Sequence, residues 1–209
     1  MKIAVIGASQ GIGYELLKMA LEEGHEVTAL LRNPSKLTIS NSRLKIVKGD
    51  ILDPASVAAV TSGQDAVCVC IGIPPTRKQV DVFSRGIECV LAAMGRAPRQ
   101  KLIAVTGIGA GDSKGHGGFI YDRVINPLLL GTIYADKDRQ ELIIQASDVE
   151  WLIVRPGFLT NGPRTGKYRV IERLSGVTAG KISRADVADF MLKQLTTPTY
   201  FRKAPLLTY

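Results

Sequence analysis

Short apolar runs alternate with amphipathic segments along most of this sequence. The first run, Lys2–Ile6, is rich in β-branched residues and ends at a glycine, which is typical of a buried strand. Apolar residues then recur at helical spacing at Ile12, Leu16 and Met19, so a helix is expected directly after a glycine-rich turn. Further apolar runs predict strands at residues 26–31, 44–47, 65–71, 101–106 and 151–156.

Amphipathic segments fill the gaps between these strands. Helices are expected at residues 79–94 and 121–146, the second broken near Pro127 and Gly131. Strands that alternate with helices predict an α/β fold with a doubly wound, parallel, Rossmann-like sheet. The expected strand order is 3-2-1-4-5-6, with ligands bound at the carboxyl ends of the strands.

The last part of the chain, residues 158–209, has a different character. It begins with a loop, and strands are expected at residues 168–171 and 205–208. Ser183 with Asp186 three residues later indicates a capped helix that runs to about Leu195. We expect this small C-terminal segment to cover the substrate side. No internal repeat or low-complexity linker divides the chain, so residues 1–209 are expected to form a single domain.

The turn after the first strand contains three glycines, Gly7, Gly11 and Gly13. Gly7 permits a tight turn, Gly11 lets the backbone approach a pyrophosphate, and Gly13 lets the helix pack against the strand. The free N–H groups and positive dipole at the helix start favour phosphate. Together with the flanking strand and helix, this turn predicts an NAD(P)-binding unit.

A dinucleotide fold contacts the adenosine ribose at the end of the second strand, about 20 residues after the glycines. NAD-specific sites place an acidic residue there, but this chain has Arg32, followed by Lys36. A guanidinium binds a 2′-phosphate bidentately, whereas a carboxylate repels it. The sequence therefore favours NADP(H) as the cofactor. The alternative is that Arg32 is a solvated charge at a strand end.

Composition fits a globular enzyme without metal. The 209 residues are 45% hydrophobic and include three cysteines, an odd number that argues against a disulfide framework. No apolar run is long enough for a membrane helix, and no signal peptide is apparent, so a cytoplasmic location and no membrane partner are expected. Cys68 and Cys70 share a strand face and are interpreted as core residues.

The net charge of +8 is concentrated between residues 155 and 184, where Glu172 is the one acid among several Lys and Arg residues. A small anionic substrate is a more economical partner for this stretch than nucleic acid, which stays the alternative. The glycine-rich residues 107–118 predict a mobile loop that forms a lid or an edge of the active site.

These motifs together resemble the atypical short-chain dehydrogenase/reductase superfamily. The similarity is greatest to its single-domain NAD(P)H-binding proteins, the group with biliverdin reductase B (flavin reductase) and the NmrA-like proteins. The matching stretches are residues 7–13, 27–37, 49–53, 64–72, 101–106, 147–156 and 162–168. The resemblance also implies cofactor-binding residues. These are Gly7, Ser9, Gln10, Gly11, Ile12, Gly13, Arg32, Lys36, Asp50, Ile51, Ile71, Gly72, Thr106, Gly107, Lys137, Pro156, Gly157, Phe158 and Leu159.

The sequence departs from typical short-chain dehydrogenases because their Tyr-x-x-x-Lys acid/base pair is missing from its place. The one such spacing, Tyr14 with Lys18, follows the phosphate turn and lies at the wrong end of the cleft. Tyr134 and Lys137 lie near the right place but one residue too close together. Thr106, Tyr134 and Lys137 are the candidate catalytic residues.

Loss of the acid/base pair bears on the reaction. Reduction of a simple ketone needs a proton donor, whereas a conjugated acceptor spreads the incoming charge and takes its proton from water. The leading hypothesis is an NADPH-dependent reductase that transfers hydride to a flavin or a similar conjugated anionic acceptor, such as a linear tetrapyrrole. The alternatives are a non-catalytic, redox-sensing NADP(H)-binding protein of the NmrA kind and a sugar-nucleotide epimerase or dehydratase.

Overall fold

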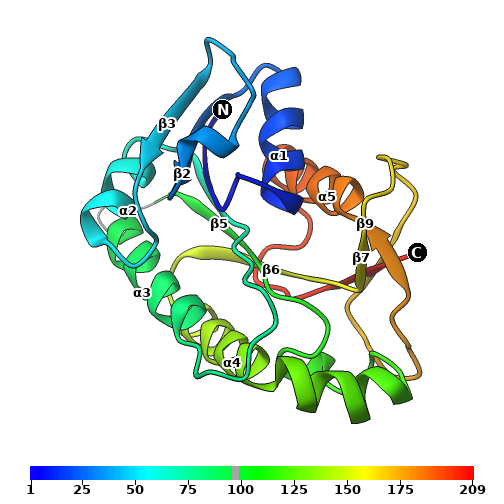
Figure 1. The fold of residues 1–209 in the computed structure, drawn as a ribbon. Coiled ribbons are helices and arrows are strands. Elements are labelled where there is room, and N and C mark those ends of the chain that lie inside the picture. The colour runs from blue at the N-terminus through cyan, green and yellow to red at the C-terminus, as the bar shows by residue number, and fades with distance from the viewer. Residues whose placement is uncertain (96–98) are drawn as a thin grey trace.

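A computed structural model describes residues 1–95 and 99–209 of the chain. An eight-stranded sheet forms the centre, with helices on both faces (Figure 1). The strands are β1 (Lys2–Ile6), β2 (Glu26–Leu31), β3 (Leu44–Lys48), β4 (Ala66–Val69), β5 (Lys101–Val105), β6 (Glu150–Pro156), β7 (Phe158–Thr160), β8 (Arg169–Ile171), β9 (Lys181–Ser183) and β10 (Leu206–Thr208). The α-helices are α1 (Gly11–Glu22), α2 (Pro54–Thr61), α3 (Val82–Met94), α4 (Gly131–Gln145) and α5 (Arg184–Thr196).

The sheet has the order β3-β2-β1-β4-β5-β6-β10-β8. Its first six strands are parallel and follow the predicted order 3-2-1-4-5-6, which is confirmed. Strand β10 continues the parallel sheet beside β6, and β8 closes the edge antiparallel to β10. Strands β7 and β9 form a separate parallel pair, which the sequence analysis did not predict.

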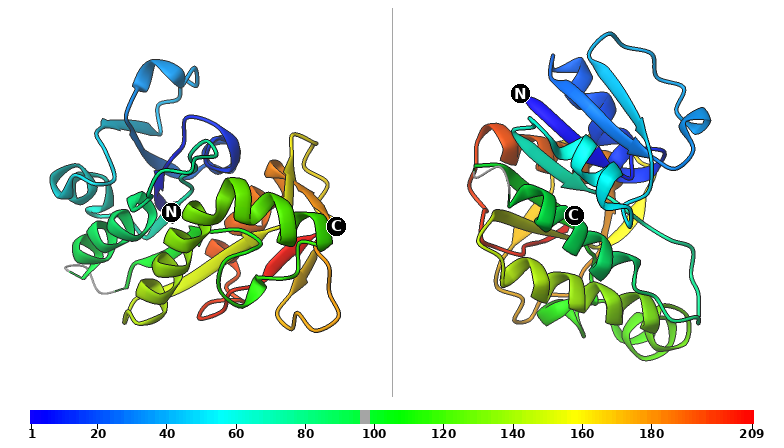
Figure 2. Two further views of the ribbon diagram at one scale, coloured as in Figure 1. Left: turned by 60° about the horizontal axis from the view of Figure 1, so that its bottom comes forward. Right: turned by 90° about the vertical axis from the view of Figure 1, so that its left-hand side faces the viewer.

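Two apolar layers hold the helices to the sheet. Successive residues of β1 point to opposite faces, so Ile3 and Val5 pack with α1 and α5, whereas Ala4 and Ile6 pack with α2, α3 and α4. The two views in Figure 2 show the sheet between these helical layers. Because both faces are covered, the central strands are buried along nearly their whole length and read as continuous apolar runs.

Helices α3 and α4 are joined by a buried carboxylate. The N-cap residue of α3, Asp81, makes no side-chain cap hydrogen bond. Instead, the fully buried Asp136 of α4 accepts hydrogen bonds from the backbone N–H of Phe83 at 2.8 Å and from the hydroxyl of Ser84. Arg139 also contacts Asp136, at 3.0 Å. A side chain of one helix therefore caps the other.

The segment before α4 is helical, as the sequence predicts, but it is wound differently. Residues Tyr121–Leu130, here called η3, form a π-helix that contains Pro127 and leads directly into α4. At Leu130 the backbone leaves helical geometry, with φ −121° and ψ −4°, and the α-helix starts at Gly131. The predicted break near Gly131 is thus a change of helix type.

The C-terminal segment is built into the fold more deeply than expected. Helix α5 packs on α1 and belongs to a main helical layer, and β8 and β10 extend the central sheet. Only β7, β9 and the first residue of α5 lie beside the carboxyl ends of the strands. Among residues 1–95 and 99–209, no helix is long and apolar enough to cross a membrane.

Candidate functional site

A cavity of about 780 Å³ lies at the carboxyl ends of the parallel strands, where this fold binds ligands. Its lining comes from β1, β2, β4, β5 and β6 together with the turns that follow them. Most of the predicted cofactor-binding residues line it. These are Gly7, Ser9, Gln10, Gly11, Ile12, Arg32, Lys36, Asp50, Ile51, Ile71, Gly72, Thr106, Lys137, Pro156 and Leu159.

The glycine turn after β1 leaves no room for a side chain at Gly7 or Gly13. Gly7 has a φ of +93°, and a Cβ atom on it would lie 2.8 Å from the carbonyl oxygen of Cys70. A Cβ atom on Gly13 would lie 2.4 Å from the carbonyl oxygen of Gly7, so this glycine lets α1 pack against the turn. Gly11 has a φ of +68°, which also favours glycine.

Helix α1 begins at this turn without a side-chain cap and without an acidic residue in its first turn. Its first backbone N–H groups therefore need a partner from outside the helix. Ser9, Gln10 and Gly11 bring this helix start to the cavity wall. An uncapped, positive helix terminus beside a cavity fits the pyrophosphate of a dinucleotide.

Arg32 and Lys36 lie at the other end of the cavity, just after β2. The side chain of Asn33 accepts hydrogen bonds from the backbone N–H of Ser35 at 3.2 Å and from its hydroxyl at 2.7 Å, which fixes the short 3₁₀ turn that carries Lys36. In residues 1–95 and 99–209, neither cation forms an ion pair with a carboxylate. Both are exposed, and both are available for a 2′-phosphate.

Asp50 and Ile51 line the cavity after β3. The Asp50 carboxylate accepts a hydrogen bond from the backbone N–H of Leu52 at 2.9 Å, so it shapes its own turn. The cap of α2 is Asp53, which accepts from Ala55 and Ser56 at 3.2 and 3.1 Å. Asp50 therefore does not cap α2, and it lines the cavity at the end where Arg32 and Lys36 lie.

Thr106 and Lys137 mark the opposite end of the cavity. Thr106 donates its hydroxyl proton to Glu141 at 2.6 Å, and the ammonium group of Lys137 donates to the backbone carbonyl of Thr106. Burial lowers the pKa of Lys137 to about 8, while nearby Glu141 opposes the shift. This end of the cavity thus has a lysine whose pKa lies well below its ordinary value of 10.5.

Glu141 belongs to a buried ion pair that sequence analysis missed. Its two carboxylate oxygens accept from Nε and Nη2 of Arg155 at 3.0 and 2.6 Å. Both side chains are nearly inaccessible, at 2% and 3% exposure. This pair holds the Thr106 hydroxyl in place from behind, with its proton committed to the carboxylate. Thr106 can therefore accept a hydrogen bond from a ligand more readily than it can donate one.

Tyr134 does not line the cavity, although Lys137 does. Its ring packs over the turn after β5, and a Cβ atom on Gly107 would lie 2.9 Å from its hydroxyl oxygen. Burial raises the pKa of the Tyr134 hydroxyl, which makes it a weaker acid. Tyr14 and Lys18 do not form the pair either, since Lys18 lies 4.0 Å from Glu22 on the solvent side of α1.

Several predicted cofactor residues pack behind the cavity wall instead of lining it. Gly157 fits closely against β9, because a Cβ atom on it would lie 2.3 Å from the carbonyl oxygen of Gly180. The ring of Phe158 packs against Tyr121 at 5.1 Å between centroids. Predicted residues outside the lining are Gly13, Gly107, Tyr134, Gly157 and Phe158.

Arg184, the first residue of α5, lines the cavity and was not among the predicted residues. A signal was present in the sequence, because this arginine is the last cation of the basic stretch and directly follows the helix cap Ser183. The sequence did not indicate that the Arg184 side chain lies close to the glycine turn. Other lining residues missed by sequence analysis are apolar, small or uncharged, such as Leu30, Asn33, Cys70, Ile73, Pro74 and Val82.

Residues 107–118, predicted as a mobile loop that forms a lid or an edge of the active site, pack against neighbouring elements in the structure. Ile108 and Ala110 are buried, and the backbone N–H of Gly111 donates to Asp138 at 2.8 Å. His116 is held to residues 177 and 179 by hydrogen bonds of 2.8 and 2.7 Å. These anchors tie the loop to α4 and to the segment before β9, and Gly109, Gly111 and Gly115 have positive φ angles that suit tight turns.

Two arginines of the basic stretch from residue 155 to 184 are paired with carboxylates and are not free for an anion. Arg155 is buried in its ion pair with Glu141, and Arg164 lies between Asp189 and Glu23 at 2.6 and 3.4 Å. Lys203, further along the chain, neutralises the single acid Glu172 at 2.9 Å. The cations that face the cofactor cavity are Arg32, Lys36, Lys137 and Arg184.

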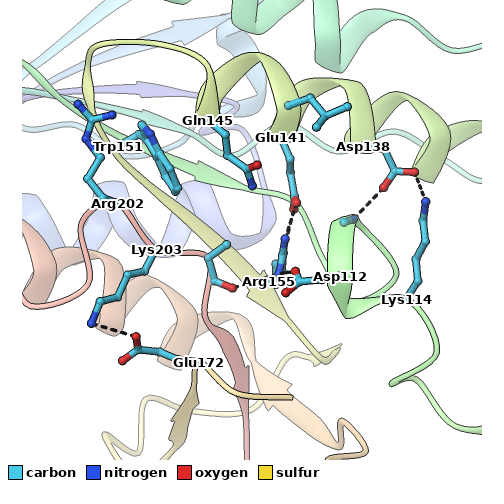
Figure 3. Close-up of a pocket in the computed structure, with 13 residues that line it drawn as sticks. Asp112, Lys114, Asp138, Glu141, Gln145, Trp151, Arg155, Glu172, Arg202 and Lys203 are labelled. Atoms are coloured by element: carbon cyan, nitrogen blue, oxygen red, sulfur yellow. Dashed lines mark hydrogen bonds and ion pairs between the residues drawn. The ribbon is translucent and has the colours of Figure 1, made fainter. Parts of the chain in front are cut away.

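A second cavity, of about 760 Å³, lies between α4, β6 and the segment before β10 (Figure 3). Its charged side chains pair with each other across the walls. Arg155 contacts Glu141 and Asp112, Lys114 contacts Asp138, and Lys203 contacts Glu172. Arg202 donates to the backbone carbonyls of residues 147 and 148.

Comparison with known proteins identifies the family. A family model described as NAD(P)H-binding matches residues 7–198, which is most of the chain. This protein belongs to the NAD(P)H-binding family. The glycine turn, the uncapped start of α1 and the free cations of the cavity are the features that fit this cofactor. The prediction of NAD(P)H as cofactor is therefore confirmed.

Curated relatives cover the chain from end to end at low identity. YwnB of Bacillus subtilis is 28% identical over 96% of this chain and 94% of its own length. YhfK of the same organism, named as a sugar epimerase, is 27% identical over 93% of this chain and 88% of its own length. An NAD(P)H azoreductase of Xenophilus azovorans is 24% identical over 97% of this chain and 66% of its own length.

Solved structures share the fold. ChuY of Escherichia coli O157:H7, described as an anaerobillin reductase, has a TM-score of 0.84 at 24% identity and covers 100% of this chain and 97% of its own. A short-chain dehydrogenase/reductase of Veillonella parvula in complex with NADP has a TM-score of 0.80 at 16% identity, with 100% and 94% covered. The predicted resemblance to atypical short-chain dehydrogenases is confirmed, because the family model assigns an NAD(P)H-binding domain and the solved structures share its fold.

Proposed function

We propose that this protein is an NADPH-dependent reductase that transfers hydride to a flavin or a similar conjugated anionic acceptor. The observation that carries the proposal is the composition of the cavity at the end opposite Arg32. Thr106 and Lys137 lie there, but no tyrosine hydroxyl lines this cavity within residues 1–95 and 99–209. The site therefore lacks the acid of typical short-chain dehydrogenases.

The chemistry of the acceptor follows from this absence. When bound, the reduced nicotinamide supplies a hydride, and the acceptor must also take up one proton. A ketone concentrates the incoming charge on one oxygen and depends on a positioned acid. A conjugated acceptor spreads that charge over its π-system and can be protonated from water. Orientation in the cleft is then the main contribution of the protein.

The preference for NADPH rests on the free cations after β2. Arg32 and Lys36 border the cavity with no carboxylate partner among the described residues, and the position normally occupied by an acidic residue is Arg32. The names of the azoreductase and the anaerobillin reductase among the similar proteins support a reductase. The anionic character of the acceptor is supported by Lys137, which keeps the cavity positive at the end opposite Arg32.

A second candidate is a non-catalytic NADP(H) sensor of the NmrA kind, which the same cofactor cavity would serve. A sugar-nucleotide epimerase is the third, and the name of YhfK points to it. Epimerases of this superfamily use the Tyr/Lys pair, however, and the Tyr134 hydroxyl packs against Gly107 outside the cavity. The geometry thus favours a reductase over an epimerase.

Turnover of NADPH with different acceptors tests the proposal. Oxidation of NADPH is followed by absorbance with FMN, riboflavin and a linear tetrapyrrole, with NADH in parallel and a simple ketone as a contrasting acceptor. Turnover with a conjugated acceptor, faster with NADPH than with NADH, is the expected result. Tight binding of NADPH without turnover of any acceptor would contradict the proposal and favour the sensor.

A further inference from the structure

Arg184 occupies a position that the paired strands β7 and β9 determine. In their register Thr160 lies opposite Ser183, so the next residues of each strand, Asn161 and Arg184, are neighbours. Nη1 of Arg184 donates to the side-chain oxygen of Asn161 at 2.7 Å. The arginine thus projects from a fixed corner of the molecule.

Three hydrogen bonds fix the backbone of that corner at Ser183. Its hydroxyl accepts from the N–H of Asp186 at 2.9 Å and donates to the carbonyl of Pro163 at 3.0 Å. Its own N–H donates to the hydroxyl of Tyr209 at 3.0 Å. The start of α5 is therefore anchored on three sides, and the Arg184 side chain leaves a preorganised backbone.

The Arg184 side chain lines the cavity beside the glycine turn. A Cβ atom on Gly11 would lie 3.8 Å from both Cδ and Nε of Arg184. Gly11 is the first residue of α1, whose N-terminus has no side-chain cap. Apart from Asn161, Arg184 has no hydrogen-bond or ion-pair partner among residues 1–95 and 99–209, so most of its donors are free.

We propose that Arg184 binds the pyrophosphate of NADP(H) beside the glycine turn, with Asn161 orienting its guanidinium. The free N–H groups of α1 and the guanidinium would both contact the phosphates. A planar guanidinium that has one N–H held by an amide oxygen presents its remaining donors in a fixed direction, which suits phosphate oxygens.

The four cations of the cavity would then each bind a different part of the cofactor. Arg32 and Lys36 contact the 2′-phosphate, Arg184 contacts the pyrophosphate, and Lys137 lies at the nicotinamide end. This inference deepens the proposed function, because it assigns a residue to the same cleft. It concerns binding alone, so it holds equally for a reductase and for a sensor.

Titration of three ligands tests the assignment without turnover. The ligands are NADP⁺, NAD⁺ and adenosine 2′-monophosphate, which has the 2′-phosphate but no pyrophosphate. In Arg184→Gln the Kd of NADP⁺ and of NAD⁺ should each rise about 10- to 100-fold, as for loss of a hydrogen bond between charged groups. The Kd of adenosine 2′-monophosphate should stay within about twofold of its original value.

Further variants separate charge, orientation and folding. Arg184→Lys should restore part of the affinity, and Asn161→Ala should weaken both dinucleotides by about two- to fivefold, as expected for a neutral hydrogen bond. The matched control is Arg169→Gln, which removes an exposed arginine that does not line the cavity. This control should leave all three ligands unaffected.

Two outcomes would overturn the assignment. Equal weakening of all three ligands by Arg184→Gln would mean that the variant disturbs the fold of the cleft. Unchanged affinity for both NADP⁺ and NAD⁺ in Arg184→Gln would mean that Arg184 does not bind the pyrophosphate. Neither outcome depends on whether the proposed reductase reaction occurs. If the Kd values change as expected but no acceptor is turned over, only the proposed function is contradicted.

Discussion

The two cavities of this protein have nearly the same volume, about 780 and 760 Å³, but they use charge in opposite ways. In the second cavity Arg155, Lys114 and Lys203 each contact a carboxylate (Figure 3). In the cofactor cavity Arg32 and Arg184 have no carboxylate partner among the described residues. One set of cations therefore joins elements of the fold, whereas the other lines a cavity without a carboxylate partner among the described residues.

This difference teaches how to assign function to charge in such a fold. A paired, buried charge is satisfied by the protein and has little left to offer a ligand. An unpaired cation beside an uncapped helix N-terminus adds to the positive charge of that terminus, and both favour the binding of an anion. Volume alone would rank the two cavities as equals, whereas the pairing of their charges separates them.

The largest expected effect comes from the buried pair behind Thr106. Glu141→Ala should destabilise the protein by about 3–5 kcal/mol, because it leaves the Arg155 guanidinium buried with one exposed partner, Asp112. For a chain of this length that corresponds to a fall in Tm of about 10 °C. Thermal unfolding followed by circular dichroism measures it.

The control for this prediction is Glu172→Gln, which breaks the half-exposed pair with Lys203. An exposed pair contributes at most about 1 kcal/mol, so its Tm should fall by only a few degrees. If Glu141→Ala lowered Tm no more than this control does, the distinction between buried and exposed pairs in the second cavity would be lost.

The next largest effect is expected in the cofactor cavity, at Arg32. Arg32→Glu should raise the Kd of NADPH about 100-fold, since it removes a charge-assisted contact and places a carboxylate beside the 2′-phosphate. NADH has no such phosphate, so its Kd should change little. Binding titrations with both cofactors measure the ratio, and Arg169→Glu is the control of equal charge change away from the cavity. Equal losses for NADPH and NADH would refute the 2′-phosphate assignment.

A pH effect of intermediate size is expected from Lys137. Its pKa is lowered from 10.5 to about 8 by burial, so its ammonium form is present below pH 8 and is lost as the pH rises through that value. If this ammonium group binds the cofactor or supplies a proton, kcat/KM should decline above about pH 8. Lys137→Met should lower the rate and abolish that decline. A pH profile that keeps the same decline in Lys137→Met would assign it to another group.

The smallest effect is expected from Lys203→Gln in the second cavity. Lys203 is partly exposed and pairs with Glu172, so unfolding free energy should fall by about 1 kcal/mol or less. The Kd of NADPH should not change, because this residue lies outside the cofactor cavity. Titration and thermal unfolding of the same preparation check both statements. A change in cofactor affinity would show that the two cavities are coupled.

The sequence predicted those parts of the fold and the site that local pattern determines. Both faces of the central strands are buried, so Lys2–Ile6 and its counterparts stand out as apolar runs, and their alternation with helices gave the strand order. The roles of Gly7 and Gly13 follow from backbone sterics at a strand-to-helix turn. The position of Arg32 follows from its distance to that turn.

Other features depend on contacts between distant residues and could not be seen locally. Strands β7 and β9 have three residues each, too few for a periodic pattern, and their pairing is what brings Arg184 to the glycine turn. Arg155 counted toward an anion-attracting stretch because its partner Glu141 lies on another element. The sequence gives the net charge of a stretch, but the fold determines which of its charged side chains form ion pairs.

The carboxylate of Asp136 couples the local unfolding of α3 to that of α4. Because it accepts from the backbone N–H of Phe83, the first turn of α3 keeps its hydrogen bonds only while α4 is in place. The two helices should then open as one cooperative unit in hydrogen–deuterium exchange, with the amides of residues 83 and 84 exchanging at the rate of α4. In Asp136→Ala these amides should exchange independently of α4, and the helix-wide protection pattern would divide at that point.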